Sequence, residues 1–123
     1  MPAYSNVTPP LALFPGDVGF SFNAEAFPAN GTSGAQFAIP EPAGFPSQGH
    51  TVRWQTIIGT AASALSITLQ GAAADVDAEY TVLDTSTATG GEARTLANVR
   101  ARFLRVNVAS STGGAGLTAK ILP

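Results

Sequence analysis

The chain has 123 residues, of which 45% are hydrophobic and 11% charged, with a formal net charge of −2 and no cysteine. This length suits one domain with a substantial core. The lack of cysteine excludes disulfides and thiolate chemistry, and the negative charge argues against nucleic acid as the main partner. Because the charged fraction is less than half the usual share, we expect neighbouring molecules to cover part of the surface.

Residues 1–50 differ in composition from the rest of the chain. They contain all but one of the nine prolines and all but one of the seven phenylalanines, and no lysine or arginine. Proline density excludes helices and favours extended structure, whereas disordered tails are poor in aromatic residues. We expect an N-terminal arm over residues 1–50, with short strands at 18–22 and 37–39.

From residue 51 the hydrophobic residues alternate with polar ones, which is typical of half-buried strands. The clearest case is 101–108, where Leu104, Val106 and Val108 share one face and Phe103, Arg105 and Asn107 share the other. Small or polar residues interrupt the pattern at 59–63 and 110–116. The expected strands of this body, residues 51–123, are 52–58, 65–70, 80–84, 94–99, 101–108 and 117–121. Together with the two short strands, they predict an all-β fold, an antiparallel β-sandwich or jelly roll of about seven or eight strands.

Few residues suggest a catalytic, metal-binding or phosphate-binding site. His50, the sole histidine, lacks a motif that supplies a nucleophile, and we interpret it as a surface hinge residue. Asp75, Asp77 and Glu79 could supply oxygens to Ca²⁺, but their spacing lacks the glycine and distal glutamate of an EF-hand, which favours a solvated acidic loop. The glycines of 113–116 lack the lysine of a phosphate loop and predict a tight connection between strands.

Trp54 and Tyr80 together could form a platform on which a sugar stacks. Trp54, however, shares its strand face with Val52 and Ile58. This pattern favours a tryptophan in the core.

Positive charge is unevenly distributed along the chain. Four arginines lie within twelve positions of the body: Arg94, Arg100, Arg102 and Arg105. In the arm, by contrast, every charged residue is acidic. One interpretation is that the arm of one subunit lies over the body of another. The other is an ordinary solvated face whose arginines pair with local carboxylates such as Asp84 and Glu92.

Three segments carry a resemblance to known families: LSITLQG at 65–71, EYTVLD at 79–84 and ARFLRVNV at 101–108. The body resembles β-sandwich modules of the discoidin or carbohydrate-binding kind. In a small Ala/Gly/Thr-rich chain, the same pattern resembles structural proteins of tailed-bacteriophage virions. The proline-rich arm fits capsid decoration proteins, whose arms grip neighbouring subunits.

The resemblance implies a non-enzymatic structural protein of the virion, specifically a capsid decoration (cement) protein made in the host cytoplasm and carried on the capsid surface. Its partners would be the major capsid protein or other virion proteins, and further copies of the chain, as a trimer at threefold positions of the shell. No nucleic acid, membrane, metal or cofactor is expected to take part. The expected partner contacts are Leu11, Leu13, Phe14, Phe20, Phe22, Arg94, Arg100 and Arg105.

The alternative function is a carbohydrate-binding β-sandwich module of a phage tail, a fibre or another surface protein. It requires aromatic side chains exposed on one sheet face or at the loops.

Overall fold

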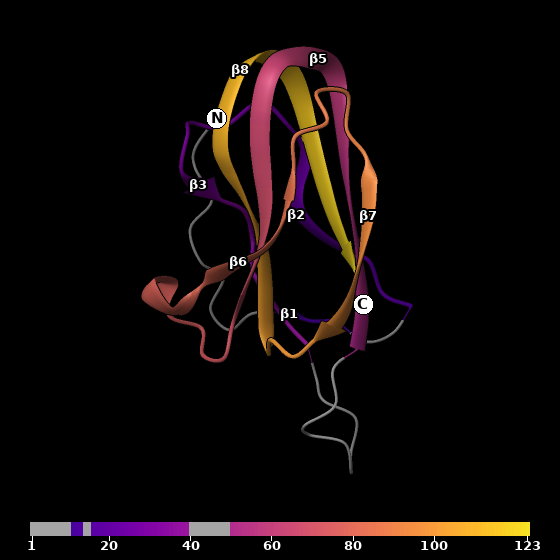
Figure 1. Cartoon of the computed structure of the whole chain (residues 1–123), viewed down its shortest axis with the longest axis vertical. Helices are drawn as coiled ribbons and strands as arrows, with labels where there is room; N and C mark the ends of the chain where they lie inside the picture. The colour runs from indigo at the N-terminus through magenta and orange to yellow at the C-terminus, as the bar shows by residue number, and fades with distance from the viewer. Residues whose placement is uncertain (1–10, 14–15, 40–49) are drawn as a thin grey trace.

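The computed structural model describes residues 11–13, 16–39 and 50–123, apart from the side chains of Leu11, Glu25 and His50 (Figure 1). The described chain is all-β, as the sequence predicts, and it also contains one short 3₁₀ turn, η1. No helix in this part of the chain is long and apolar enough to cross a membrane. The elements are β1 (Leu11–Ala12), β2 (Gly19–Glu25), β3 (Thr32–Ser33), β4 (Phe37–Ala38), β5 (His50–Ala72), η1 (Asp77–Glu79), β6 (Thr81–Ser86), β7 (Ala93–Val99) and β8 (Phe103–Leu122).

Two long antiparallel strands, β5 and β8, organise the fold. They pair along nearly their whole length, from Arg53 opposite Leu122 to Ala72 opposite Phe103. Both arch over at one end of the molecule, so each contributes to two facing layers (Figure 1). The first half of β5 and the last part of β8 are flanked by β7 and β2. The second half of β5 and the first part of β8 are flanked by β6, β3 and β4, and β1 adds to β4 in parallel. The result is an antiparallel β-sandwich.

The arch corrects the strand boundaries that the sequence predicts. The predicted interruptions at 59–63 and 110–116 are continuous strand, because Thr60 still pairs with Ala115 and Ala62 with Gly113. Gly113, Gly114 and Gly116 all have positive φ. Left-handed backbone is a conformation that glycine adopts without steric cost. Small residues therefore bend the paired strands instead of ending them.

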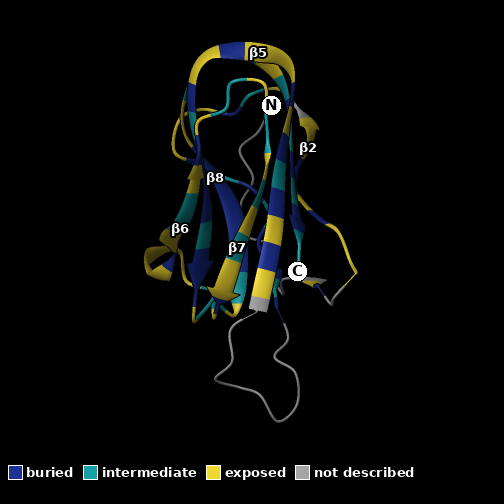
Figure 2. Ribbon diagram, turned by 45° about the vertical axis from the view of Figure 1, so that its right-hand side comes forward, coloured by how far each residue is buried: buried dark blue, intermediate teal, exposed yellow. Residues whose placement is uncertain are grey.

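Alternating residues of the long strands form the core between the layers. Trp54, Ile67, Leu104, Val106 and Ile121 are all at most 1% exposed. Figure 2 shows buried and exposed residues alternating along the first half of β5. The face assignments made for 52–58 and 101–108 are confirmed for their hydrophobic residues.

The N-terminal segment corrects the predicted division into arm and body. The short strands expected at 18–22 and 37–39 are present as β2 and β4, but both pair with β8. Leu13 and Phe22, at 5% and 1% exposure, lie in the core. The described part of residues 1–50 therefore belongs to the sandwich. Its strands pair with β8 and its buried phenylalanine rings fill part of the core. Phe14, residues 1–10 and residues 40–49 lie outside the described residues.

Candidate functional site

One polar cluster closes the edge of the sandwich between β6 and β7. Arg94 of β7 donates hydrogen bonds from Nε and Nη2 to the two carboxylate oxygens of Asp84 on β6, at 2.8 and 3.1 Å. The buried Trp54 of β5 donates from Nε1 to Asp84 Oδ2 at 3.0 Å. Since β6 and β7 belong to different layers, this fork-shaped ion pair joins the layers at their edge.

The surroundings of Asp84 hold it in the charged form. Burial by itself would raise the pKa of this carboxyl group, but hydrogen bonds from Arg94, Trp54 and the Thr85 backbone nitrogen outweigh it, so the pKa lies below its usual value. The bonds to Asp84 and its negative charge in turn raise the pKa of Arg94. Glu92 lies 3.4 Å from Arg94 Nη1 and accepts a bond of 2.7 Å from Ser86 Oγ. Local pairing of Arg94 with Asp84 and Glu92, one of the two interpretations of the arginine run, is confirmed.

A second polar cluster covers the outer side of β8. Arg105 is 5% exposed, and its Nε donates to Gln70 Oε1 at 2.8 Å. Its Nη1 donates to Asp77 Oδ1 at 2.6 Å, and the guanidinium lies 4.0 Å from the centre of the Tyr80 ring. This stacked and hydrogen-bonded geometry is one to which arginine is well suited. The prediction of Arg105 as a partner contact is wrong, because the 75–80 segment of its own chain covers it.

Asp75, in the same segment, accepts hydrogen bonds from two side chains of its own chain. Tyr80 Oη donates to Asp75 Oδ1 at 2.9 Å, and Gln36 Nε2 donates to Asp75 Oδ2 at 3.1 Å. Burial raises the pKa of Tyr80, and the hydrogen bond to Asp75 and its charge raise it further.

The carboxylates considered as Ca²⁺ ligands do not converge. Asp75 faces Tyr80 and Gln36, Asp77 faces Arg105, and Glu79 is exposed. Within residues 11–13, 16–39 and 50–123, no group of three or more histidine, cysteine or acidic residues could hold a metal ion.

The sugar platform suggested for Trp54 and Tyr80 is contradicted by their burial. Trp54 is 1% and Tyr80 8% exposed, and each ring lies inside a cluster described above. The interpretation of Trp54 as a core residue is confirmed.

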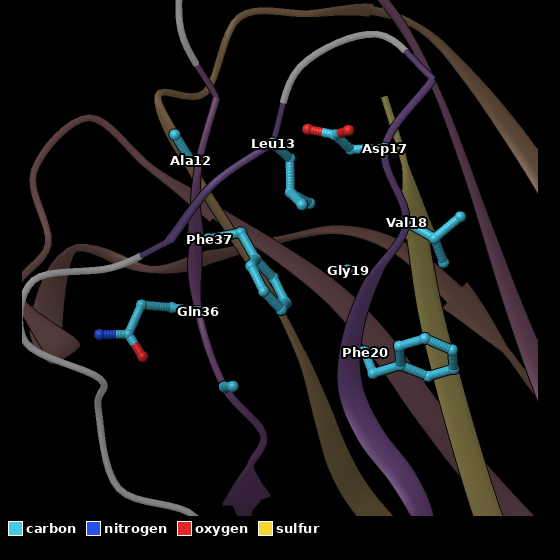
Figure 3. Close-up of a pocket in the computed structure, with 9 residues that line it drawn as sticks. Ala12, Leu13, Asp17, Val18, Gly19, Phe20, Gln36 and Phe37 are labelled. Atoms are coloured by element: carbon cyan, nitrogen blue, oxygen red, sulfur yellow. The ribbon is translucent and has the colours of Figure 1, made fainter.

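An open groove of about 490 Å³ lies between β2 and the β1–β4 pair. Leu13 and Phe37 point towards Gly19 at its floor, with the Asp17 carboxylate near Leu13 (Figure 3). A Cβ added to Gly19 would lie 2.6 Å from Leu13 Cδ1, so the floor is tightly packed. Val18 and Phe20 also line the groove, and their side chains lie on the same side of β2 as each other (Figure 3).

The exposed large hydrophobic side chains were not all identified from the sequence. Among the described residues they are Val18, Phe20, Ile57, Val76 and Val82, at 41–55% exposure. Of these, only Phe20 was among the predicted contacts. Arg100 is also exposed, whereas Leu13 and Phe22 are buried in their own chain and unavailable to a partner. The side chain of Leu11 and all of Phe14 lie outside the described residues.

No family model matches the chain, and no curated protein matches it. Among solved structures, it is similar to the crystal structure of the SPBc2 prophage-derived protein YomS. The sequence identity is 13% and the TM-score 0.49, over 85% of this chain and 92% of that chain. A likeness at this level says nothing about what this chain does.

Proposed function

We propose that the protein is a structural protein of a bacteriophage virion, specifically a capsid decoration protein that stabilises the head shell through protein–protein contacts. The observation that carries the proposal is the contrast between its polar and apolar groups. The polar groups around Asp84 and Arg105 pair with one another within the chain, whereas Phe20, Ile57 and Val82 are large hydrophobic side chains exposed on its strands. Exposed apolar groups that gather on one face favour a protein interface. The assignment to a phage virion rests on the sequence resemblance.

The fold changes the mechanism expected for this function. Leu13 and Phe22 stabilise the sandwich itself, so these two residues do not provide the contact with the shell. Phe20, 41% exposed on β2, takes that role in the proposal. The proposed partners are the major capsid protein or other virion proteins, together with further copies of the chain, and the protein is not an enzyme.

The experiment uses shells of the phage that encodes this chain, assembled without the protein. Wild-type protein and the Phe20→Ser variant are titrated onto these shells, and bound protein is measured after sedimentation. We expect Phe20→Ser to weaken shell binding at least tenfold, because it removes an apolar contact without touching the core.

Thr85→Ala serves as the control, because Thr85 is exposed on β6 and donates to Asp84 Oδ1 from its backbone nitrogen, which the substitution keeps. Deletion of residues 1–22 would be a poor test, since it removes β1 and Phe22 and so damages the fold. Absence of wild-type binding to such shells would contradict the proposal. Undiminished binding of Phe20→Ser would show that Phe20 is not part of the contact with the shell.

A further inference from the structure

The outer face of the layer formed by β7, β5, β8 and β2 combines exposed apolar residues with positive charge. Cross-strand pairing places Phe20, Lys120, Gln55 and Ala93 in one row across the four strands. The same register sets Ile57 beside Thr118, and Arg53 between Leu122 and Thr95.

Three of the exposed hydrophobic side chains belong to this face. Phe20 and Ile57 are 41% and 42% exposed, and Val18, 43% exposed, points to the same side of β2 as Phe20 (Figure 3). Lys120 Nζ lies 5.6 Å from the centre of the Phe20 ring. The rows contain two cations, Arg53 and Lys120, and no acidic residue among their described members. We call this surface the cationic face.

The end of the connection from β5 to β6, together with the first two residues of β6, has the opposite character. Residues 76–82 carry two acidic residues and no lysine or arginine, and their η1 turn protrudes beyond β6 (Figure 1). Val76 and Val82 are 52% and 55% exposed, and the Asp77 side chain is 80% exposed. We call this segment the acidic knob.

The acidic knob is held in a defined shape by its own chain. Arg105 binds Asp77, and the backbone nitrogen of Glu79 donates to Val76 O at 2.9 Å. Such a segment loses little conformational entropy when it docks on another surface.

These two surfaces include all five exposed large hydrophobic residues of the described chain and are opposite in charge. We infer that the acidic knob of one copy docks on the cationic face of a second copy. The inference rests on the proposed structural function, for which it names a partner. Pairing two cationic faces would bring the positive charges of Arg53 and Lys120 in one copy close to those of the other, which disfavours a symmetric contact through that face.

The contact joins different surfaces of the two copies. The knob is next to β6 in one layer, and the face belongs to the other layer. A head-to-tail contact of this kind produces a ring when its rotation closes and a filament when it does not.

Sedimentation velocity of the isolated full chain, over a range of concentrations at low and high salt, measures the association. We expect the weight-average mass to rise above that of the monomer with concentration, and the association to weaken at high salt. Ile57→Thr on the face and Val76→Ser on the knob should each raise the dissociation constant at least tenfold. Both side chains are exposed, so circular dichroism and melting temperature should remain those of the wild type.

Charge reversal tests the pairing of the two surfaces directly. Glu79→Lys on the knob and Arg53→Glu on the face should each weaken association, and combining them in one chain should restore it. Arg102→Glu is the matched control, because Arg102 is an exposed arginine of the β7–β8 connection outside the face, whereas Arg100 lines a pocket together with Glu79 of the knob. Combined with Glu79→Lys, it should restore nothing.

A wild-type chain that stays monomeric at every concentration would overturn the inference, as would an oligomer that Ile57→Thr and Val76→Ser leave unchanged. Equal rescue by Arg102→Glu would show a general charge effect and would overturn it too. These outcomes are independent of binding to shells, which alone tests the proposed function.

Discussion

Ser21 Oγ lies 3.0 Å from the backbone nitrogen of Val106 and accepts its hydrogen bond, although 85 positions separate the two residues. Ser21 belongs to β2 in one layer, and Val106 belongs to the part of β8 in the other. The same hydroxyl donates to Ala35 O at 2.9 Å, and Ser21 O accepts from the Ala35 nitrogen at 3.0 Å. One fully buried serine thus ties the layers together along the edge opposite the Asp84–Arg94 pair.

Ser21→Ala should therefore destabilise the protein by about 1–3 kcal/mol, the usual cost of leaving buried hydrogen-bonding groups without a partner. Urea unfolding at neutral pH measures the change. Ser110→Ala, at an exposed serine of the arch, should stay within about 0.5 kcal/mol of the wild type. If the two variants were equally stable, the Ser21 hydroxyl would not be a structural link.

Asp84→Asn should lower the free energy of unfolding at pH 7 by about 1–2 kcal/mol, because it replaces charge-assisted bonds by neutral ones. The folded-state pKa of Asp84 is depressed, so its contribution is fully present above the pKa of the unfolded state, about 3.9. It is lost as the pH falls below about 4 and through the folded-state value. Urea unfolding between pH 7 and pH 3 should show wild type and variant converging at the acid end. A gap that stays constant with pH would show that the charge of Asp84 does not contribute.

The sequence predicts much of the β-sandwich because alternation reports which residues face the core. The burial of Trp54 and of Leu104, Val106 and Val108 follows from period two alone. The pairing of Arg94 with Asp84 could be anticipated because the two residues lie on consecutive strands with a short connection.

The remaining features depend on partners far apart in the chain. Alternation places Arg105 on the side of β8 opposite Val106, but it does not reveal that residues 75–80 fold over that side and bury it. Runs of glycine and small residues have the same composition in a loop and in a bent strand. The arch therefore becomes visible only through the pairing of Thr60 with Ala115. The apolar character of Phe22 does not distinguish a ring buried in its own core from one offered to a neighbour.

Tyr80→Phe should cost about 0.5–1.5 kcal/mol at neutral pH through loss of the bond to Asp75. Burial, followed by the bond to Asp75, raises the pKa of Tyr80 above its value in the unfolded chain. The contribution of this phenol is therefore present below about pH 10 and declines as the pH rises above it. Unfolding experiments between pH 8 and 11 should show the wild type losing its advantage over Tyr80→Phe at the alkaline end. An advantage that grows with pH would contradict the raised pKa.

Gly116→Ala tests whether the arch depends on backbone conformation. Gly116 has φ +73, and a Cβ added there would meet only Gly59 atoms at 3.7 Å, an ordinary contact. Any loss of stability therefore comes from the left-handed backbone, which costs a residue with a side chain about 1–2 kcal/mol. Gly116→Asn should cost less, because asparagine tolerates this conformation better than alanine.

Gly90→Ala is the control, since Gly90 lacks positive φ and has nothing within 4 Å of an added Cβ. Thermal and urea unfolding should rank the variants Gly90→Ala, Gly116→Asn and Gly116→Ala in order of falling stability. Equal stability of the two alanine variants would mean that the bend does not require a left-handed residue at position 116.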